Sequence, residues 1–194
     1  MRSKNTIKTQ NEGGRVEVIA KYFLLTMLLS FLGWAFEVGI TFVQTGRFYD
    51  RGFMMMPFCP IYGVSLIIVY FLLGTPNEGR GILKNERNPF KRYSLYLLFA
   101  FLVPTVSELL VGFVFDVFFD MSLWSYTGFP LNFRGYISLP ISICWTALVF
   151  LFMKFLFAPL KRLVFKIPKN LSITLAIIVF IATMVDLSIS YRAI

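Results

Sequence analysis

The feature that most constrains this chain is a series of apolar stretches, each of about the length that crosses a lipid bilayer. A spanning helix needs about 20 consecutive, mostly apolar residues. Charged residues make up 15% of the chain, against about 25% in a typical soluble domain, so a soluble fold would lack polar surface. Five stretches meet the criterion, the second of them marginally: residues 19–43, 57–74, 93–119, 136–157 and 171–190.

These stretches predict an all-α, polytopic membrane protein with about five transmembrane helices. We divide the chain into a polar arm at residues 1–18, a single transmembrane domain at 19–190 and a short tail at 191–194. The first apolar stretch continues past Glu37 without the small-residue cleavage site that follows the apolar core of a signal peptide. We therefore expect a retained span.

The basic residues are divided unevenly between the two predicted sides of the membrane. Fifteen of the 19 lie in the arm up to Lys21, in the loop at 80–92 or in the segment at 154–169. Five spans would place these three regions on one side, and short cytoplasmic loops carry the excess of Lys and Arg. We predict a cytoplasmic N-terminus and an outer C-terminus. The net charge of +9 then reports orientation in a bilayer and not an affinity for nucleic acid.

Several kinds of catalytic chemistry lack their residues here. The sequence contains no His and two Cys, Cys59 and Cys144. This composition excludes Ser-His-Asp triads and His-ligated metals, and two Cys are too few for a Cys-only zinc site. The Gly-rich pattern that cradles nucleotide phosphates is also absent from these 194 residues. We expect no metal and no cofactor, and any ATP hydrolysis would need a separate subunit.

Four acidic residues fall inside the predicted spans. An ionised carboxylate at mid-membrane costs about 2.5–3.5 kcal/mol, and such residues usually face a bundle interior or an aqueous cavity. Glu37, Asp116 and Asp186 fall in the outer parts of their spans, and Glu108 falls near the middle. Asp186 lies close enough to the end of its span to reach the interface. Glu108 and Asp116 are eight residues apart, within about 80° around a helix, so one cavity could receive both.

The outer loops provide cationic partners for these acids. Arg51 follows the first span, and Asn132 and Arg134 precede the fourth. A planar guanidinium suits paired hydrogen bonds to carboxylates or phosphates. Two interpretations remain open: an ion-pair network that locks the loops to the helices, or a ligand site.

Two connecting segments are unusual for exposed loops. Residues 53–63 are apolar yet contain two prolines, which predicts irregular backbone or a half-helix that enters the membrane. Residues 120–134 include Trp124 and Tyr126 and resemble an aromatic turn at the membrane interface.

On the cytoplasmic side, residues 154–166 interleave basic and apolar side chains. This pattern fits either anionic lipid or a docking surface for a soluble ATPase.

An ordered set of short motifs resembles the CmpB-type ABC-transporter permease family of small bacterial membrane proteins. The likeness covers residues 31–150. Its first half is Phe31-Leu32-Gly33-Trp34 with Glu37, Arg51-Gly52-Phe53, Pro57 and Pro60-Ile61-Tyr62-Gly63. Its second half is Glu108, the acid at Asp116, Trp124 and Tyr126, Leu131-Asn132-Phe133-Arg134-Gly135 and Trp145.

The chain departs from the family pattern at several of these positions. Asp50 stands where the family has Asn before Arg-Gly-Phe, and Met56 stands where a Gly precedes Pro57. Asp116 stands where the acid is usually Glu, and Ser125 replaces an Asp between the two aromatic residues. The last change removes one charge from the outer cluster, so the site differs in this chain.

The resemblance implies a multi-pass permease of the bacterial plasma membrane that works with a separate cytoplasmic ATPase. Because five spans are few for a translocation path, we expect a homo-oligomer or a partner membrane subunit. The candidate substrate- or ion-binding or structural cluster consists of Glu37, Arg51, Tyr62, Glu108, Asp116, Trp124, Tyr126, Asn132 and Arg134. Two alternatives remain: a membrane-embedded enzyme acting on lipid or isoprenoid headgroups, and a non-catalytic assembly or sensor subunit.

Overall fold

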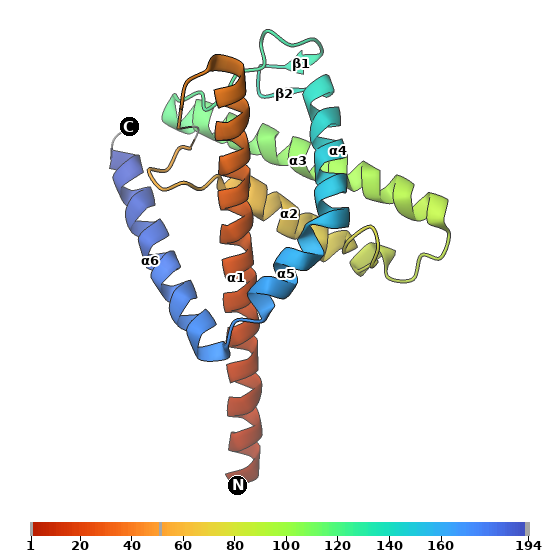
Figure 1. Ribbon diagram of the computed structural model, residues 1–194, viewed down its shortest axis with the longest axis vertical. Coiled ribbons are helices and arrows are strands. Elements are labelled where there is room, and N and C mark those ends of the chain that lie inside the picture. The colour runs from red at the N-terminus through yellow and green to blue at the C-terminus, as the bar shows by residue number, and fades with distance from the viewer. Residues whose placement is uncertain (1, 51, 193–194) are drawn as a thin grey trace. The chain divides into compact units, whose positions relative to one another are not determined.

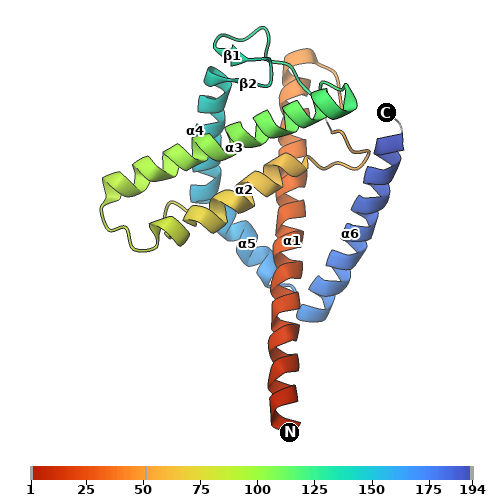
Figure 2. The same cartoon turned by 180° about the vertical axis from the view of Figure 1, so that it is seen from behind.

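The computed structural model describes the backbone of residues 2–50 and 52–192 and the side chains of residues 13–50 and 52–191. Figures 1 and 2 show a helical chain with one small hairpin. Its elements, in chain order, are α1 (Arg2–Thr45), α2 (Pro60–Leu73), the 3₁₀ turn η1 (Gly81–Leu83), α3 (Pro89–Phe119), β1 (Asn132–Phe133), β2 (Ile137–Ser138), α4 (Leu139–Phe155), α5 (Phe157–Phe165) and α6 (Lys169–Arg192).

The helices confirm an all-α, multi-pass membrane protein. Three are long and apolar enough to cross a bilayer, at Gly13–Thr45, Pro89–Phe119 and Lys169–Tyr191. A fourth crossing results if α4 and α5, which meet at a bend of 50°, count as one span. The fifth predicted span stays a prediction, because α2 has 14 residues.

The element boundaries differ from the predicted ones at three places. The described part of the arm is helical and continuous with α1. The fourth apolar stretch was expected to begin a helix at Tyr136, but residues 137–138 form β2 and the helix begins at Leu139. Residues 52–59 contain no helix, and α2 begins at Pro60, where proline suits the first helical position because its missing N–H is not needed there.

The chain divides into two compact units. The first contains α1 and the segment that follows it to Phe58, together with residues 160–192. In this unit α1 packs along α6, with Leu25 and Leu29 buried and the rings of Phe23 and Phe180 edge to face at 6.1 Å.

The second unit runs from Cys59 to Pro159. Here α3 packs against both α2 and α4. The buried Tyr96 hydroxyl donates to the carbonyl of Gly74, at 3.2 Å, and Ser65 of α2 donates to Ser107 of α3, at 3.0 Å. Bonds of this kind between small polar side chains help to join helices in a membrane.

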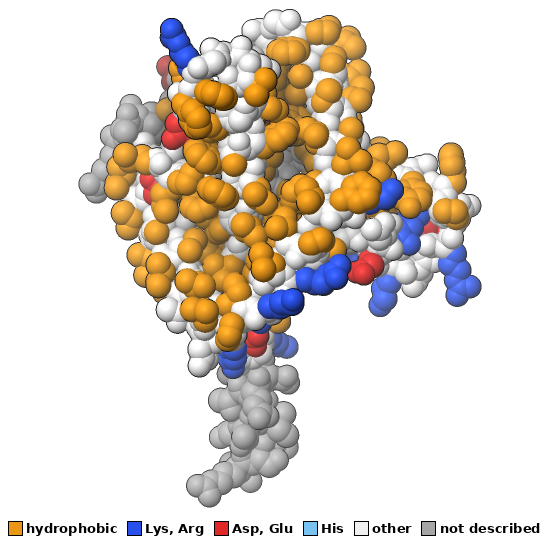
Figure 3. Space-filling model, in the orientation of Figure 1, with side chains coloured by type: hydrophobic (Ala, Val, Ile, Leu, Met, Phe, Trp, Pro, Cys, Tyr) orange, Lys and Arg blue, Asp and Glu red, His pale blue; other side chains and the backbone are white. Residues whose placement is uncertain are grey.

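The outer faces of the helices are apolar. Figure 3 shows hydrophobic side chains covering most of the visible surface. Val43 is 84% exposed and Phe118 is 72% exposed. Large exposed apolar surfaces are rare on soluble monomers, and a lipid bilayer is the environment that matches them.

Candidate functional site: an aromatic loop on an acidic helix face

The loop between α3 and α4 folds into a compact structure. We call residues 120–138 the aromatic loop. It begins where Asp120 adopts a left-handed conformation, with φ of 51°, and ends α3. It ends in an antiparallel pair of short strands, in which Asn132 is opposite Ser138 and Phe133 is opposite Ile137.

A tight turn joins these two strands. Arg134 and Gly135 both have positive φ, 52° and 74°, and a side chain at Gly135 would lie 3.0 Å from a methyl group of Thr127. Asn132 stabilises the turn, since its Oδ1 accepts from the Gly135 amide at 3.2 Å and its Nδ2 donates to the Phe129 carbonyl at 2.8 Å. The structure therefore places Asn132 in a loop-organising role.

Two tyrosines fix the loop to helix α3, and a tryptophan holds one of them within the loop. The Tyr126 hydroxyl donates to Oε1 of Glu108, at 3.1 Å, and the Tyr136 hydroxyl donates to Oδ2 of Asp116. The Trp124 indole N–H donates to the carbonyl of Tyr136, at 2.9 Å. Four of these five residues were predicted from the sequence as site residues, and Tyr136 was not.

The two carboxylates lie on one face of α3 with a glycine between them. Glu108, Gly112 and Asp116 are each four residues apart, a spacing that aligns side chains along a helix. A Cβ atom at Gly112 would lie 3.2 Å from Cδ1 of Tyr136 and 3.5 Å from Cζ2 of Trp124. Gly112 therefore gives the aromatic rings room to approach the helix. We call these three residues the acidic face.

The two carboxylates differ in burial. Glu108 is 9% exposed, whereas Asp116 is exposed. The hydrogen bond to Asp116 is the main cause that raises the pKa of Tyr136 above its usual value, and Arg134 opposes this shift through its positive charge. The raised pKa is expected, because an ionised phenol could no longer donate to the carboxylate.

Tyr62 also belongs to the second unit. It lies in the first turn of α2, with its ring 5.3 Å from that of Trp145 on α4. The second unit therefore contains seven of the nine predicted site residues. Five of them make hydrogen bonds within the aromatic loop or between this loop and α3: Glu108, Asp116, Trp124, Tyr126 and Asn132.

One of the remaining two predicted residues belongs to the first unit. Glu37 is half-buried on α1, and Arg51 lies outside the described residues. Beside Arg51 in the sequence, Oδ1 of Asp50 accepts from the Trp34 indole at 2.9 Å and from the Gly52 amide at 3.1 Å. Asp50, which stands where the family has Asn, thus anchors the start of the irregular segment at residues 52–59 to α1.

Asp186 has a role that the sequence did not reveal. We expected it to reach the membrane interface, but it is 6% exposed. Its Oδ1 accepts from the Met55 amide at 3.2 Å, and its Oδ2 accepts from the Met56 amide at 3.0 Å. Asp186 therefore holds the irregular segment before α2 against α6.

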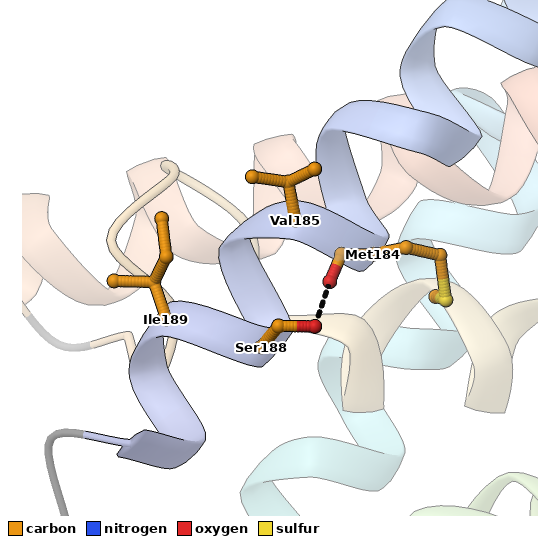
Figure 4. Close-up of a pocket in the computed structure, with 4 residues that line it drawn as sticks. All are labelled: Met184, Val185, Ser188 and Ile189. Atoms are coloured by element: carbon orange, nitrogen blue, oxygen red, sulfur yellow. Dashed lines mark hydrogen bonds between the residues drawn. The ribbon is translucent and has the colours of Figure 1, made fainter.

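A shallow depression lies on α6, with a volume of about 290 Å³. Figure 4 shows its four lining residues, Met184, Val185, Ser188 and Ile189. The Ser188 hydroxyl donates to the Met184 carbonyl at 2.8 Å, so the lining is almost wholly apolar. A surface of this kind suits a lipid chain better than a polar ligand. No group of His, Cys, Asp or Glu in the described part of the chain could hold a metal ion.

The sequence matches a family described as Putative ABC-transporter type IV, over residues 23–191. The chain belongs to this family. The match extends beyond the region of the resemblance and includes α6 with Asp186. Comparisons with curated proteins and with solved structures gave no match.

Proposed function

We propose that this protein is the membrane-embedded permease subunit of an ABC-type transporter, which moves a substrate with energy from a separate ATPase. The observation that carries the proposal is the family match over residues 23–191. Two features agree with it: helices long enough to cross a membrane, and the absence of a nucleotide-binding pattern from these 194 residues. A subunit that spans the membrane but binds no nucleotide needs an ATPase partner.

We further propose five crossings in a bacterial plasma membrane, with the N-terminus in the cytoplasm. Helix α2 is about 21 Å long at 1.5 Å per residue, less than the hydrocarbon core of about 30 Å. The irregular segment that precedes it would supply the rest of the crossing. The unequal distribution of Lys and Arg between the loops supports the orientation. Since five helices are few for a translocation path, the transporter would contain at least two membrane subunits.

Within this function, Glu108 is our candidate ligand for a substrate or coupling ion. Glu108 is 9% exposed on an apolar helix. Burying a carboxylate inside a membrane costs free energy, so a functional role is the default interpretation. The aromatic loop would cover it through Tyr126, and Arg134 of the same loop would shape the outer entrance. On the cytoplasmic side, α5 presents the exposed Arg162 and Leu163 as a docking surface for the ATPase.

The first experiment identifies the partner. The tagged protein is purified from its native membrane in mild detergent, and bound proteins are identified by mass spectrometry. We expect a stoichiometric ATPase and ATP hydrolysis by the complex. A protein that associates with itself alone, without an ATPase, would contradict the permease assignment.

A second experiment tests Glu108 itself in membrane vesicles that contain the complex. Glu108→Gln keeps the side-chain size and removes the charge, so we expect transport to be lost while ATPase binding remains. Asp120→Asn is the matched control, since Asp120 is an exposed acid at the end of the same helix. Full transport by Glu108→Gln would remove Glu108 from the candidate site.

A further inference from the structure

Arg92 lies in the first turn of α3, where a positive charge is destabilising. The first turn of this helix is Pro89-Phe90-Lys91-Arg92 and contains no acid. The amino end of a helix carries a partial positive charge, so cations there are destabilising and anions are stabilising. Two adjacent cations in this turn therefore call for compensating negative charge.

Lys91 and the free amides of the turn already have their partners. Lys91 Nζ lies 3.0 Å from Oε2 of Glu86. The amide of Asn88 together with Lys91 lowers the pKa of the Glu86 carboxyl, so this carboxylate is ionised at neutral pH. Oδ1 of Asn88 accepts from the amides of Phe90 and Lys91.

The Arg92 guanidinium has no such partner within the described part of the chain. Its Nε and Nη2 atoms are buried and make no hydrogen bond there. These two nitrogens form one edge of the guanidinium plane, and their N–H bonds point in nearly the same direction. This edge matches two oxygens of one carboxylate or phosphate. Leaving both donors desolvated and unpaired is costly.

The position of Arg92 along α3 indicates which oxyanion is available. The helix has 31 residues and is about 46 Å long, which is enough to reach from one headgroup layer to the other. If α3 spans the bilayer from one headgroup layer to the other, its first turn lies at the level of the lipid phosphates. Phe90, two residues before Arg92, is 81% exposed, and Arg92 as a whole is half-buried, so part of the residue reaches the protein surface.

We propose that the Nε–Nη2 edge of Arg92 binds a phosphate group, supplied by the headgroup of a membrane phospholipid. Because this edge is buried in the structure, binding requires a rotation of the outer torsions of the side chain that turns it toward the headgroup. The bound phosphate then satisfies both donors and supplies the anion that the first turn of α3 lacks. Basic side chains at the ends of membrane helices recognise anionic headgroups in this way.

The test uses the full-length chain, delipidated in mild detergent and titrated with phosphatidylglycerol. Retained lipid is counted by native mass spectrometry, and the melting temperature is followed in parallel. We expect the lipid to raise the melting temperature of the wild type. Arg92→Lys keeps the charge but loses the two-donor edge, and Arg92→Gln loses both, so lipid retention should fall about tenfold in each.

Arg87→Gln is the matched control, because Arg87 is exposed in the loop just before α3 and the charge change is identical. It should retain lipid as the wild type does. Equal loss in Arg87→Gln and Arg92→Gln would overturn the proposal, and so would wild-type retention by Arg92→Lys.

A separate titration distinguishes lipid from free phosphate. Sodium phosphate is compared with sodium chloride at equal ionic strength, without lipid. Stabilisation by phosphate alone, lost in Arg92→Lys, would overturn the lipid source and assign the edge to a soluble phosphate. Because the wild-type titrations need no variant, a failure of Arg92→Gln to fold leaves the test intact: wild-type protein stabilised by neither probe would overturn the site.

Discussion

In the first unit the carboxylate of Asp186 accepts two backbone amides, those of Met55 and Met56. In the second unit the carboxylates of Glu108 and Asp116 accept hydroxyl groups of tyrosine side chains. Both arrangements fix an irregular segment to a long apolar helix. They differ in what they require of the segment: a backbone amide is supplied by almost any residue, whereas a hydroxyl at the right depth is supplied by Tyr.

This difference separates two roles for acids in apolar helices. The contacts of Asp186 depend on backbone conformation, and breaking them leaves amides without an acceptor. The contacts of Glu108 and Asp116 depend on side chains that can rotate away, leaving the carboxylate available to another ligand. The aromatic loop is thus better suited to opening than the segment at residues 52–56.

The largest effect is expected from Asp186→Ala. Two amide donors lose their acceptor, at about 1–3 kcal/mol for each buried group, so unfolding free energy should fall by at least about 2 kcal/mol. Thermal unfolding of the detergent-solubilised protein measures this loss. Ser188→Ala on the same helix removes an exposed hydroxyl and should be nearly neutral. Equal stability of Asp186→Ala and Ser188→Ala would show that the amide contacts do not hold the segment.

Tyr126→Phe should lower the free energy of unfolding by less than Asp186→Ala does, because it removes one hydrogen bond and keeps the ring. A hydrogen bond to a charged group is worth about 1.5–3 kcal/mol. Tyr93→Phe, also in the second unit, is the control, since no hydrogen bond of the Tyr93 hydroxyl is seen in the described part of the chain. Combining Tyr126→Phe with Glu108→Gln should cost less than the sum of the single changes. Strict additivity of the two changes would mean that the side chains do not interact.

The sequence predicted the fold class and the acidic face from local patterns. Apolar stretches indicated spanning helices, and a spacing of eight placed Glu108 and Asp116 on one face. The hydrogen-bond partners of the acidic residues could not be predicted from the sequence, for two reasons. Tyr136 is 20 residues from Asp116 and follows the tight turn at Arg134 and Gly135 that reverses the chain. Asp186 binds amides 131 and 130 residues away, and a backbone amide has no sequence signature. Gly112, midway between the two acids, was the available signal that something packs there.

Gly112→Leu tests whether the rings must lie close to the acidic face. A leucine would collide with Tyr136 and Trp124, and overpacking typically costs about 1–3 kcal/mol. Gly39→Leu is the matched control, because no atom beyond its chain neighbours and the nearby backbone of its own helix lies within 4 Å of a Cβ at this position, and leucine favours helices. Exchange of the aromatic-loop amides with deuterium should accelerate in Gly112→Leu alone. Unchanged protection there would indicate that the loop does not depend on close packing at Gly112.

The smallest effect concerns Tyr136 and its pH dependence. Its folded-state pKa is raised above the usual value, which is about 10, so the folded protein holds this proton more tightly than the unfolded chain. The stabilisation is fully present below pH 10 and is lost as the pH rises toward the folded pKa. Between pH 9 and 11 the melting temperature of the wild type should fall more steeply than that of Tyr136→Phe, which has no proton to lose. Parallel curves would show that the bond to Asp116 does not stabilise the fold, and Tyr126 alone would then hold the loop to the acidic face.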